Sequence, residues 1–501
     1  MENSIIIIGA GIAGLAAGCY AQMNGYRSRI FEMHNLPGGL CTAWERKGYL
    51  FDGCIHYLFG SAPGQPFYQL WQELGALEGK KFVHHEELMR VSDTYGNTLI
   101  GYCDPDRLEA HLIEISPDDA QLIKSFCQGI RAFTKFDLSC LQLKPKTLMA
   151  PQDWSDFGKK MLPFVAPLLQ WGMISAEQFA RKFKHPFLQK AIPQLFAWPS
   201  IPAMVGMFLL AYMNNKNAGY PIGASLNFAK DLEKRYLELG GEITYNAQVE
   251  RILVDGNRAV GVKLYDNQEF QATRIVSAAD GRNTIFELLG ERYVNKAIRR
   301  MYDGHLPIHS QIQVSLGVNR DLSSEPHWVT YLFDQPITIA GEDRYEVGVK
   351  HYCHDPNTAP PGKSAMILMM PTQYDYWQRI YGRRIYDIEQ IQEAETMITA
   401  VEQVYPGLSE DIEMVDVATP LSYERYTGNW QGSSCGWLLT RDTMFMMING
   451  IQKTLPGLRN FYMVGQWVEP GGSLPVVAMS GRNAIQLICH EDGKHFTGKP
   501  A

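Results

Sequence analysis

The sequence of 501 residues contains no uninterrupted apolar run of the roughly 18–20 residues that cross a bilayer, so we expect no transmembrane helix. It contains no CxxC pair, and its nine cysteines are scattered and odd in number, which argues against a disulfide framework and favours a reducing compartment. It has no excess of positive charge: 46 basic residues face 53 acidic ones, and the net charge of −7 argues against nucleic-acid binding. These absences favour a cytoplasmic protein.

The composition that remains is that of a globular protein, with 46% hydrophobic and 20% charged residues. A chain of this length exceeds what one hydrophobic core ordinarily supports, so we expect at least two domains. Neither an internal repeat nor a low-complexity tract is visible. The organisation therefore has to be worked out from individual motifs.

Residues 5–18 read IIIIGAGIAGLAAG and predict a strand, a tight turn and a helix. Gly9 permits the turn, Gly11 leaves room for a phosphate beside the backbone, and Gly14 lets the helix pack close to the strand. The amides at the start of the helix favour a negatively charged group. Glu32 ends the next predicted strand, where a carboxylate can accept hydrogen bonds from a ribose. The pattern predicts a site for an ADP-ribosyl group.

Two further segments have the same mixed character as the first. The middle segment predicts a helix within 220–240 and then strands, which we expect at 242–254, 257–265 and 268–277. The last segment predicts a strand at 461–465, a turn with proline and two glycines, and a helix from about 476 to 488. The nucleotide domain is therefore expected to consist of residues 1–60, 219–289 and 456–501.

The remaining residues, 61–218 and 290–455, are expected to form a second, α+β domain that binds a substrate. Residues 61–218 have a mainly helical pattern, whereas the later stretch contains alternating strands such as 311–318 and 365–370. The second domain would thus combine a sheet with a largely helical part.

Several motifs in a fixed order resemble those of the flavin-dependent phytoene desaturase family within the amine oxidase-like superfamily, nearest to its retinol saturase and carotenoid isomerase branch. They are GAGIAGLAAG with Glu32, PGGLC at 37–41, GYLFDGCIHYL at 48–58, YPIGAS at 220–225, LGGEITYNAQVERI at 239–252, APPG at 359–362, TPLSYERYTGNWQGSSCG at 419–436, and NFYMVGQWVEPGGSLPVVAMSGRNA at 460–484. The resemblance implies an α/β fold: a Rossmann-like FAD-binding domain of the GR2 type, assembled from three separated segments, and an α+β substrate domain with a helical lid.

The resemblance also implies that FAD is the cofactor, because a freely exchanging nicotinamide would not require a second contact region at the far end of the chain. The residues expected to bind FAD are Gly9, Gly11, Ile12, Ala13, Gly14, Glu32, Met33, Gly38, Gly39, Leu40, Ile55, His56, Val249, Gly465, Gln466, Leu474, Pro475 and Val476. Leu40 stands where many relatives carry an arginine, so this position can contribute only packing or backbone contacts. Cys41 and Cys54 lie near the expected flavin, but the resemblance implies non-covalent binding.

The residues expected to carry chemistry are few, because a flavin supplies the electrons and the protein supplies alignment and exclusion of water. A saturase also needs a proton donor, and His56, Tyr57 and Glu469 are the candidates. The alternative interpretation is that His56 and Tyr57 only pack around the ring system and that Glu469 is an ordinary turn residue. No metal site is expected.

Two apolar stretches, 161–174 and 201–212, lie within a predicted helical lid around 155–215. Each is too short to cross a membrane and contains proline, and lysines and arginines flank them. They form either an interfacial lid on a membrane surface or a buried wall of the substrate pocket. Both interpretations imply a hydrophobic substrate.

We therefore expect an FAD-dependent saturase or desaturase that acts on carbon–carbon bonds of an isoprenoid or polyene lipid. The first alternative is a polyene cis–trans isomerase that uses reduced FAD. Less favoured alternatives are an amine oxidase and a prenyl-protein-binding protein without redox activity. The sequence does not predict the oligomeric state.

Overall fold

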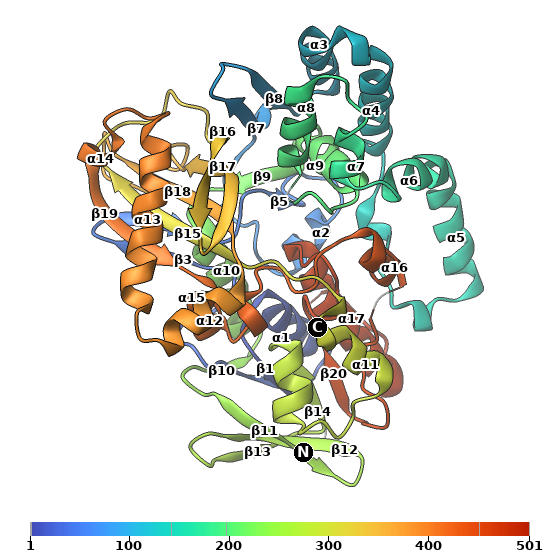
Figure 1. Cartoon of the computed structure of the whole chain (residues 1–501). Coiled ribbons are helices and arrows are strands. Elements are labelled where there is room, and N and C mark those ends of the chain that lie inside the picture. The colour runs from blue at the N-terminus through green and yellow to red at the C-terminus, as the bar shows by residue number, and fades with distance from the viewer. Residues whose placement is uncertain (1–2, 142, 197, 450, 500–501) are drawn as a thin grey trace.

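The computed structural model describes residues 3–141, 143–196, 198–449 and 451–499. One of its two large sheets has five strands in the order β10-β2-β1-β14-β20, and every adjacent pair is parallel. The strands are β1 (Ser4–Ile8), β2 (Arg27–Phe31), β10 (Glu242–Thr244), β14 (Arg274–Ser277) and β20 (Phe461–Met463). They come from the beginning, the middle and the end of the chain, and these segments meet in the lower half of Figure 1.

Three helices pack together beside this sheet: α1 (Ile12–Met23), α10 (Ala224–Glu238) and α17 (Leu474–Glu491). The middle helix, α1, is buried along nearly its whole length. Glycines in α1 and in α17 allow the neighbouring elements to pack this closely. A Cβ atom on Gly14 would lie 2.0 Å from the carbonyl oxygen of Gly9, and one on Gly18 would lie 2.7 Å from the ring of Tyr236 in α10. The contact with α17 is equally close, since a Cβ atom on Gly481 would lie 2.4 Å from the oxygen of Ala13.

A three-stranded antiparallel meander lies next to the parallel sheet. It is formed by β11 (Val249–Asp255), β12 (Arg258–Leu264) and β13 (Glu269–Gln271). The middle segment of the chain thus supplies the expected helix and strands, although the predicted strand over 242–254 is divided into β10 and β11. The C-terminal helix, at Leu474–Glu491, is longer at both ends than the predicted 476–488.

The second large sheet has seven strands in the order β19-β15-β18-β17-β16-β7-β8. They are β7 (Glu87–Asp93), β8 (Thr98–Tyr102), β15 (Gln311–Val318), β16 (Trp328–Ile339), β17 (Glu342–His351), β18 (Ser364–Pro371) and β19 (Ile412–Ala418). The expectation that 61–218 is mainly helical missed β7 and β8. They form a short hairpin at the edge of the sheet, and β7 pairs in parallel with the distant β16.

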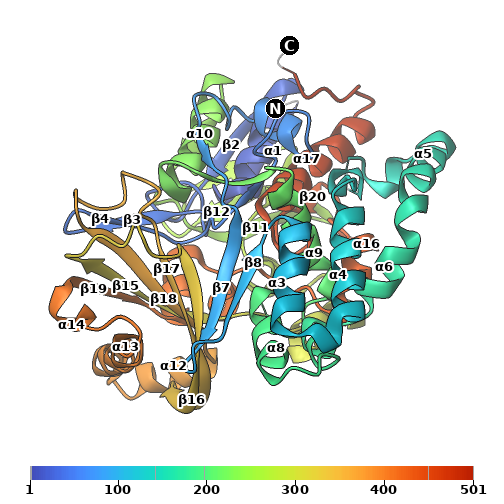
Figure 2. The ribbon, with the colours of Figure 1, turned by 90° about the horizontal axis from the view of Figure 1, so that it is seen from above.

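Helices lie on both sides of this sheet in Figure 2. One group includes α3 (Pro105–Ile115), α4 (Ala120–Phe133), α7 (Ala176–Ala180), α8 (Pro186–Ala191) and α9 (Ala203–Asn214), with α5 (Pro151–Met161) and α6 (Val165–Gly172) at its outer side. The other group includes α12 (Tyr374–Gly382), α13 (Tyr386–Glu402), α14 (Leu408–Asp411) and α15 (Pro420–Thr427). No helix in the described part of the chain has the length and apolar character needed to cross a membrane.

Shorter elements connect these layers. They are β3 (Ala43–Arg46), β4 (Tyr49–Asp52), β5 (Leu58–Phe59), β6 (Phe82–Val83), β9 (Ala218–Pro221), α2 (Tyr68–Glu73), α11 (Lys296–Arg300) and α16 (Arg441–Asn449). β9 pairs with both β5 and β6 at the junction of the helical layer and the nucleotide segments. The chain therefore crosses between the two large sheets close to the region that the sequence assigns to the flavin ring.

The close contact between α1 and α17 predicts that Gly481→Ala lowers stability. The added methyl group would meet backbone atoms of Ala13 and Ala17, and overpacking of this kind costs about 1–3 kcal/mol. This exceeds the roughly 0.5–1 kcal/mol that alanine gains over glycine inside a helix. Scanning calorimetry should show a melting temperature lower by several degrees.

The matched control is Gly158→Ala in α5, where an added Cβ atom would meet nothing within 4 Å. This variant should melt at the wild-type temperature or slightly above it. Equal melting temperatures for both variants would show that the two helices do not depend on the contact at Gly481.

Candidate functional site

One cavity of about 1160 Å³ brings together residues from distant parts of the chain. Its lining includes the turn after β1, the loop after β2, the start of β11, the turn after β14, the segment 421–429 and the turn after β20. The parallel strands β1, β2, β14 and β20 all end at this cavity. A ligand at the carboxyl ends of parallel strands is the usual arrangement in open α/β sheets.

The floor of the cavity is built from two glycine-containing loops. The Gly38 N–H donates to the Ala10 oxygen at 2.9 Å, and Gly11 and Gly38 form an isolated parallel bridge. Gly38 has a φ of +105°, and a Cβ atom there would lie 2.3 Å from the Cys41 oxygen, so a side chain at this position is sterically excluded. The cavity is therefore floored by bare backbone, as a bound phosphate group requires.

Glu32 stands at the end of β2 as the sequence predicts, and its carboxylate is buried. It accepts hydrogen bonds from the Ala10 N–H at 2.6 Å and from the His34 N–H at 2.8 Å. Burial raises the pKa of this carboxyl group, and the two backbone donors oppose that shift. These contacts fix the carboxylate in the cavity wall between the glycine turn and the loop after β2.

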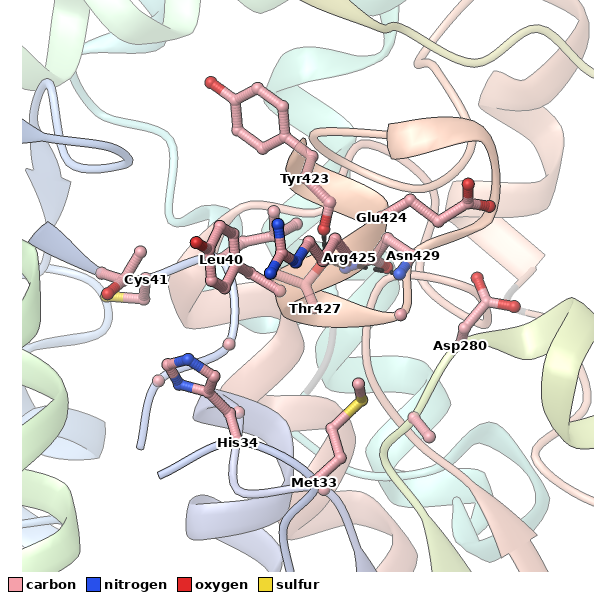
Figure 3. A pocket seen from close by; sticks show the side chains of 18 of the residues that line it. Met33, His34, Leu40, Cys41, Asp280, Tyr423, Glu424, Arg425, Thr427 and Asn429 are labelled. Carbon is pink, nitrogen blue, oxygen red and sulfur yellow. Dashed lines mark hydrogen bonds between the residues drawn. The ribbon is translucent and has the colours of Figure 1, made fainter. Parts of the chain in front are cut away.

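The segment 421–429, comprising most of α15 and the loop after it, forms a wall of the cavity that the sequence analysis did not identify. Its end touches the loop after β2, because the rings of Tyr426 and His34 meet edge to face at 5.7 Å. Beyond it, the Trp430 N–H donates to Asp280 at 2.9 Å. Burial raises the pKa of Asp280 to about 6, while backbone donors oppose the shift. Figure 3 shows Asp280 and Asn429 on this side of the cavity.

A buried carboxylate, Asp52, organises the loop that leads toward His56. Its two oxygens accept hydrogen bonds from the Cys54 N–H at 3.0 Å, the Tyr220 hydroxyl at 3.1 Å, and both the backbone N–H and the hydroxyl of Ser225. Ser225 in turn accepts from the Ile55 N–H at 2.7 Å. Burial raises the pKa of Asp52. The network therefore holds residues 53–56 in one conformation, and Gly53 and Cys54 line the cavity.

His56 is bonded to a lysine from the other large sheet. The Lys350 ammonium in β17 donates to His56 Nδ1 at 2.7 Å, and only 2% of Lys350 is exposed. Burial lowers the pKa of Lys350 to about 7, against a smaller opposing effect of the Asp52 carboxylate. Burial also lowers the pKa of His56, and the lysine charge adds to this. The His56 ring packs against Trp328 with ring centroids 4.9 Å apart.

Most of the residues expected to bind the cofactor line this cavity. They are Gly9, Gly11, Ile12, Ala13, Glu32, Met33, Gly38, Gly39, Leu40, Val249, Gly465, Gln466 and Leu474. Five others are not part of its lining: Gly14, which packs α1 against the turn, and Ile55, His56, Pro475 and Val476. Pro475 is buried within the first turn of α17. The structure thus gathers the two ends of the chain at one cavity, and direct cofactor contacts stay predictions.

Glu469 does not fit the expectation of a proton donor at the cavity. Its carboxylate is buried and forms an ion pair with Lys453, and it is not among the residues that line the cavity. The alternative expectation of a turn residue is closer, although the side chain is buried. Tyr57 is partly buried and packs near Phe59, with ring centroids 5.6 Å apart. Its catalytic role stays a prediction.

The cavity fits a dinucleotide such as FAD on two structural grounds. Its floor is the bare backbone of two glycine loops at the start of a helix, and a buried carboxylate stands beside it at the end of β2. The same cavity continues to Gly53, Cys54, Gln466 and Trp467, which provide a wall for a second, flatter part of the ligand. The residues present therefore suit an extended ligand with phosphates in its middle.

Comparisons with known proteins agree with this geometry. Residues 7–74 match the family model of the NAD(P)-binding Rossmann-like domain. The chain is 24% identical to a lycopene-forming phytoene desaturase from Paracoccus over 97% of both chains, and 26% identical to the chloroplastic prolycopene isomerase of Arabidopsis thaliana over 97% of this chain and 83% of the relative.

A solved structure of putrescine oxidase bound to putrescine has the same fold. The two align with a TM-score of 0.59 and 13% identity, over 97% of this chain and 99% of the oxidase. The predicted fold class, an α/β protein with a Rossmann-like domain of the amine oxidase-like type, is thereby confirmed. The full-length similarities to a phytoene desaturase and a prolycopene isomerase agree with the phytoene desaturase-like family that the sequence motifs resemble.

Proposed function

We propose that the protein is an FAD-dependent oxidoreductase that saturates or desaturates carbon–carbon bonds of a hydrophobic polyene. The observation that carries the proposal is one cavity. It joins the glycine floor, the Glu32 carboxylate and the part of the wall that Gly53 and Cys54 form. The names of full-length relatives, phytoene desaturase and prolycopene isomerase, support a carotenoid-like substrate. In this proposal residues 1–60, 219–289 and 456–501 bind the cofactor, and the rest of the chain binds the substrate.

FAD would be held by elements at both ends of the chain. Gly11, Gly38 and Gly39 would face its phosphates, Glu32 its ribose, and Val249 its adenine. The 53–54 turn and Gln466 would border its ring system. A bound flavin supplies the capacity to accept or donate a hydride, and the chain supplies orientation, an enclosed site and a proton.

The second candidate is a polyene isomerase that needs reduced FAD, because prolycopene isomerases match the chain over nearly its whole length. The intact glycine floor and the buried Glu32 give less support to a prenyl-binding protein without a cofactor. Putrescine oxidase, an amine oxidase, shares the fold. A shared fold at 13% identity does not indicate a shared substrate.

The two main candidates differ in the mass of their product. Purified protein should bind FAD. Incubation with a carotenoid such as prolycopene or lycopene, either anaerobically with NADPH as the reductant or without NADPH and with oxygen or a quinone as the oxidant, should yield product for mass spectrometry. We expect a change of two hydrogens, which identifies a saturase or desaturase. A product of unchanged mass with altered double-bond geometry would identify the isomerase, and a protein without affinity for FAD would refute both.

Saturation requires a proton, and the Lys350–His56 pair is the buried acid that we assign to this task. The lysine ammonium donates to Nδ1, which leaves the neutral imidazole with its proton on Nε2. His56 can then release that proton while Lys350 replaces it at Nδ1. His85, His327, His351 and His354 also feel the charge of Lys350, and for each of them burial is the larger cause of a lowered pKa. Like His56 they are mainly neutral, but among the described residues only His56 accepts a hydrogen bond from Lys350 that could replace a released proton.

This assignment predicts the pH dependence of saturation. Because Lys350 loses its proton near pH 7, the rate should fall as the pH rises through about 7. Lys350→Met should lower the rate of saturation by about 10²-fold. It should also abolish the fall in rate between neutral and alkaline pH. The control is Lys363→Met, which removes an exposed lysine paired with Glu413 and should keep the wild-type profile.

Stability gives an independent readout of the same group. The unfolded chain holds a proton on Lys350 up to about pH 10.5 and the folded chain only up to about pH 7, so the free energy of unfolding rises with pH in this window. Denaturant titrations at pH 7 and 10 should show a smaller rise in Lys350→Met than in wild type. An identical rise in both proteins would refute the lowered pKa.

The helical lid at 155–215 also supports a proposal about association with a membrane surface. Leu162 and Leu169 in the α5–α6 region are 74% and 65% exposed, Trp154 and Val165 are exposed beside them, and Lys159 and Lys160 lie on the same segment. An apolar surface of this kind flanked by lysines suits the interface of an anionic membrane. We infer a protein that associates with the membrane surface through α5 and α6, where a hydrophobic substrate would enter.

Sedimentation with vesicles that contain phosphatidylserine tests this proposal. The double variant Leu162→Glu/Leu169→Glu should reduce the bound fraction by at least about tenfold, because each leucine loses its apolar burial in the lipid. Leu237→Glu in α10, at another exposed leucine, serves as the control and should bind like wild type. Equal binding of all three proteins would contradict the assignment of α5 and α6.

A further inference from the structure

The charges that line the cavity are unfavourable for an anionic ligand. Its acidic residues are Glu32, Asp280, Asp387, Asp416 and Glu424, and its arginines are Arg46 and Arg425. A dinucleotide such as FAD carries two negative phosphate groups in its middle. Backbone amides alone offset this charge in part, so a favourable site needs a cation close to the phosphates. Leu40, which lies beside the glycine floor, supplies none.

The two arginines differ in their partners. Arg46 is engaged by Asp416, whose Oδ1 accepts from Nε at 3.2 Å. Arg425 has no ion pair among the residues that the structure describes. Its guanidinium meets the ring of the adjacent Tyr426 at 5.5 Å, and the side chain is exposed to the open cavity. Of the two cations, Arg425 is the one whose hydrogen-bond donors are available to a ligand.

The surroundings of Arg425 place it beside the loop after β2. The next residue, Tyr426, contacts the His34 ring, and a Cβ atom on Gly428 would lie 3.5 Å from Met33 Sδ, so the end of α15 rests on the loop after β2. Figure 3 shows the Arg425 side chain extending from α15 toward Leu40.

The neighbouring acid does not cancel this charge. The Glu424 carboxylate points away from Leu40 in Figure 3 and accepts a hydrogen bond from the Tyr374 hydroxyl at 2.6 Å. The carboxylate beside the glycine floor, Glu32, already accepts hydrogen bonds from the amides of Ala10 and His34. The guanidinium therefore faces the part of the cavity where the phosphates are expected.

We propose that Arg425 binds the pyrophosphate of the dinucleotide, reaching it from α15 across the cavity. This inference rests on the proposed function, in which the cavity holds FAD. It assigns the cationic contact to the substrate-side segment 421–429, so the ligand is bound between that segment and the glycine floor.

The test measures binding and needs no turnover. FAD binding to the apoprotein is followed by flavin fluorescence, and ADP and adenosine are measured as competitors. Arg425→Gln should weaken FAD and ADP binding by about 10- to 100-fold, the usual effect of losing charge-assisted hydrogen bonds, and should leave adenosine binding unchanged. Arg425→Lys should restore part of the affinity. Raising the salt concentration should weaken FAD binding less in Arg425→Gln than in wild type.

Arg46→Gln is the matched control, because it removes the other arginine of the same cavity. It should bind FAD and ADP like wild type. An Arg425→Gln variant with wild-type affinity for ADP, or one that loses ADP and adenosine equally, overturns the inference and leaves the proposed function intact. A wild-type protein that binds neither FAD nor ADP refutes the proposed function itself, and the inference with it.

Discussion

Close backbone contact around α1 is the constraint on which the rest of the structure depends. Gly14 brings the helix against the turn at Gly9, Gly18 admits the ring of Tyr236, and Gly481 lets α17 touch the same helix. Because α10 and α17 come from the middle and the end of the chain, these three glycines join distant segments behind one parallel sheet. The cavity exists because that sheet is complete. The glycine floor, the Glu32 carboxylate and the opposite wall of the cavity each follow a strand of this sheet. Without the sheet, these strands would not end at the same place.

Different elements supply the backbone groups and the charged side chains of this region. The parallel sheet supplies backbone amides and one fixed carboxylate, which suit a ligand that is held permanently. Side chains come from other elements: the seven-stranded sheet places Lys350 at His56, outside the cavity lining, and the segment 421–429 places Arg425 in the cavity wall. The glycine turns and the Glu32 carboxylate belong to one local motif, whereas Lys350 and Arg425 come from elements that meet this motif only in the folded protein. Substitution of Lys350 would therefore leave the glycine turns and Glu32 unchanged.

This division explains how much of the site could be predicted from the sequence. Gly9, Gly11 and Glu32 are recognisable because a strand, a turn and a helix follow one another within a short stretch. The pairing of Lys350 with His56 leaves no such pattern, because it joins residues far apart in the chain and a single lysine near the end of a strand has no periodicity. The hairpin of β7 and β8 was missed for a similar reason. Its parallel partner β16 lies in another region of the sequence, and helices surround it on both sides. The burial of Glu469 could not be predicted, because its ion pair with Lys453 is a tertiary contact.

The buried charges near His56 carry the strongest argument for chemistry at this end of the cavity. Asp52 and Lys350 are both almost fully buried, yet they do not form a direct ion pair in the described structure. Asp52 is saturated by donors from Cys54, Tyr220 and Ser225, so its negative charge is already stabilised. The lysine has His56 and two aromatic faces, Trp328 and Tyr352, as its surroundings. A methionine would fill this space at lower desolvation cost. The hydrogen bond from the lysine to Nδ1 gives its proton a direct route to the imidazole, in agreement with the acid that we propose for saturation.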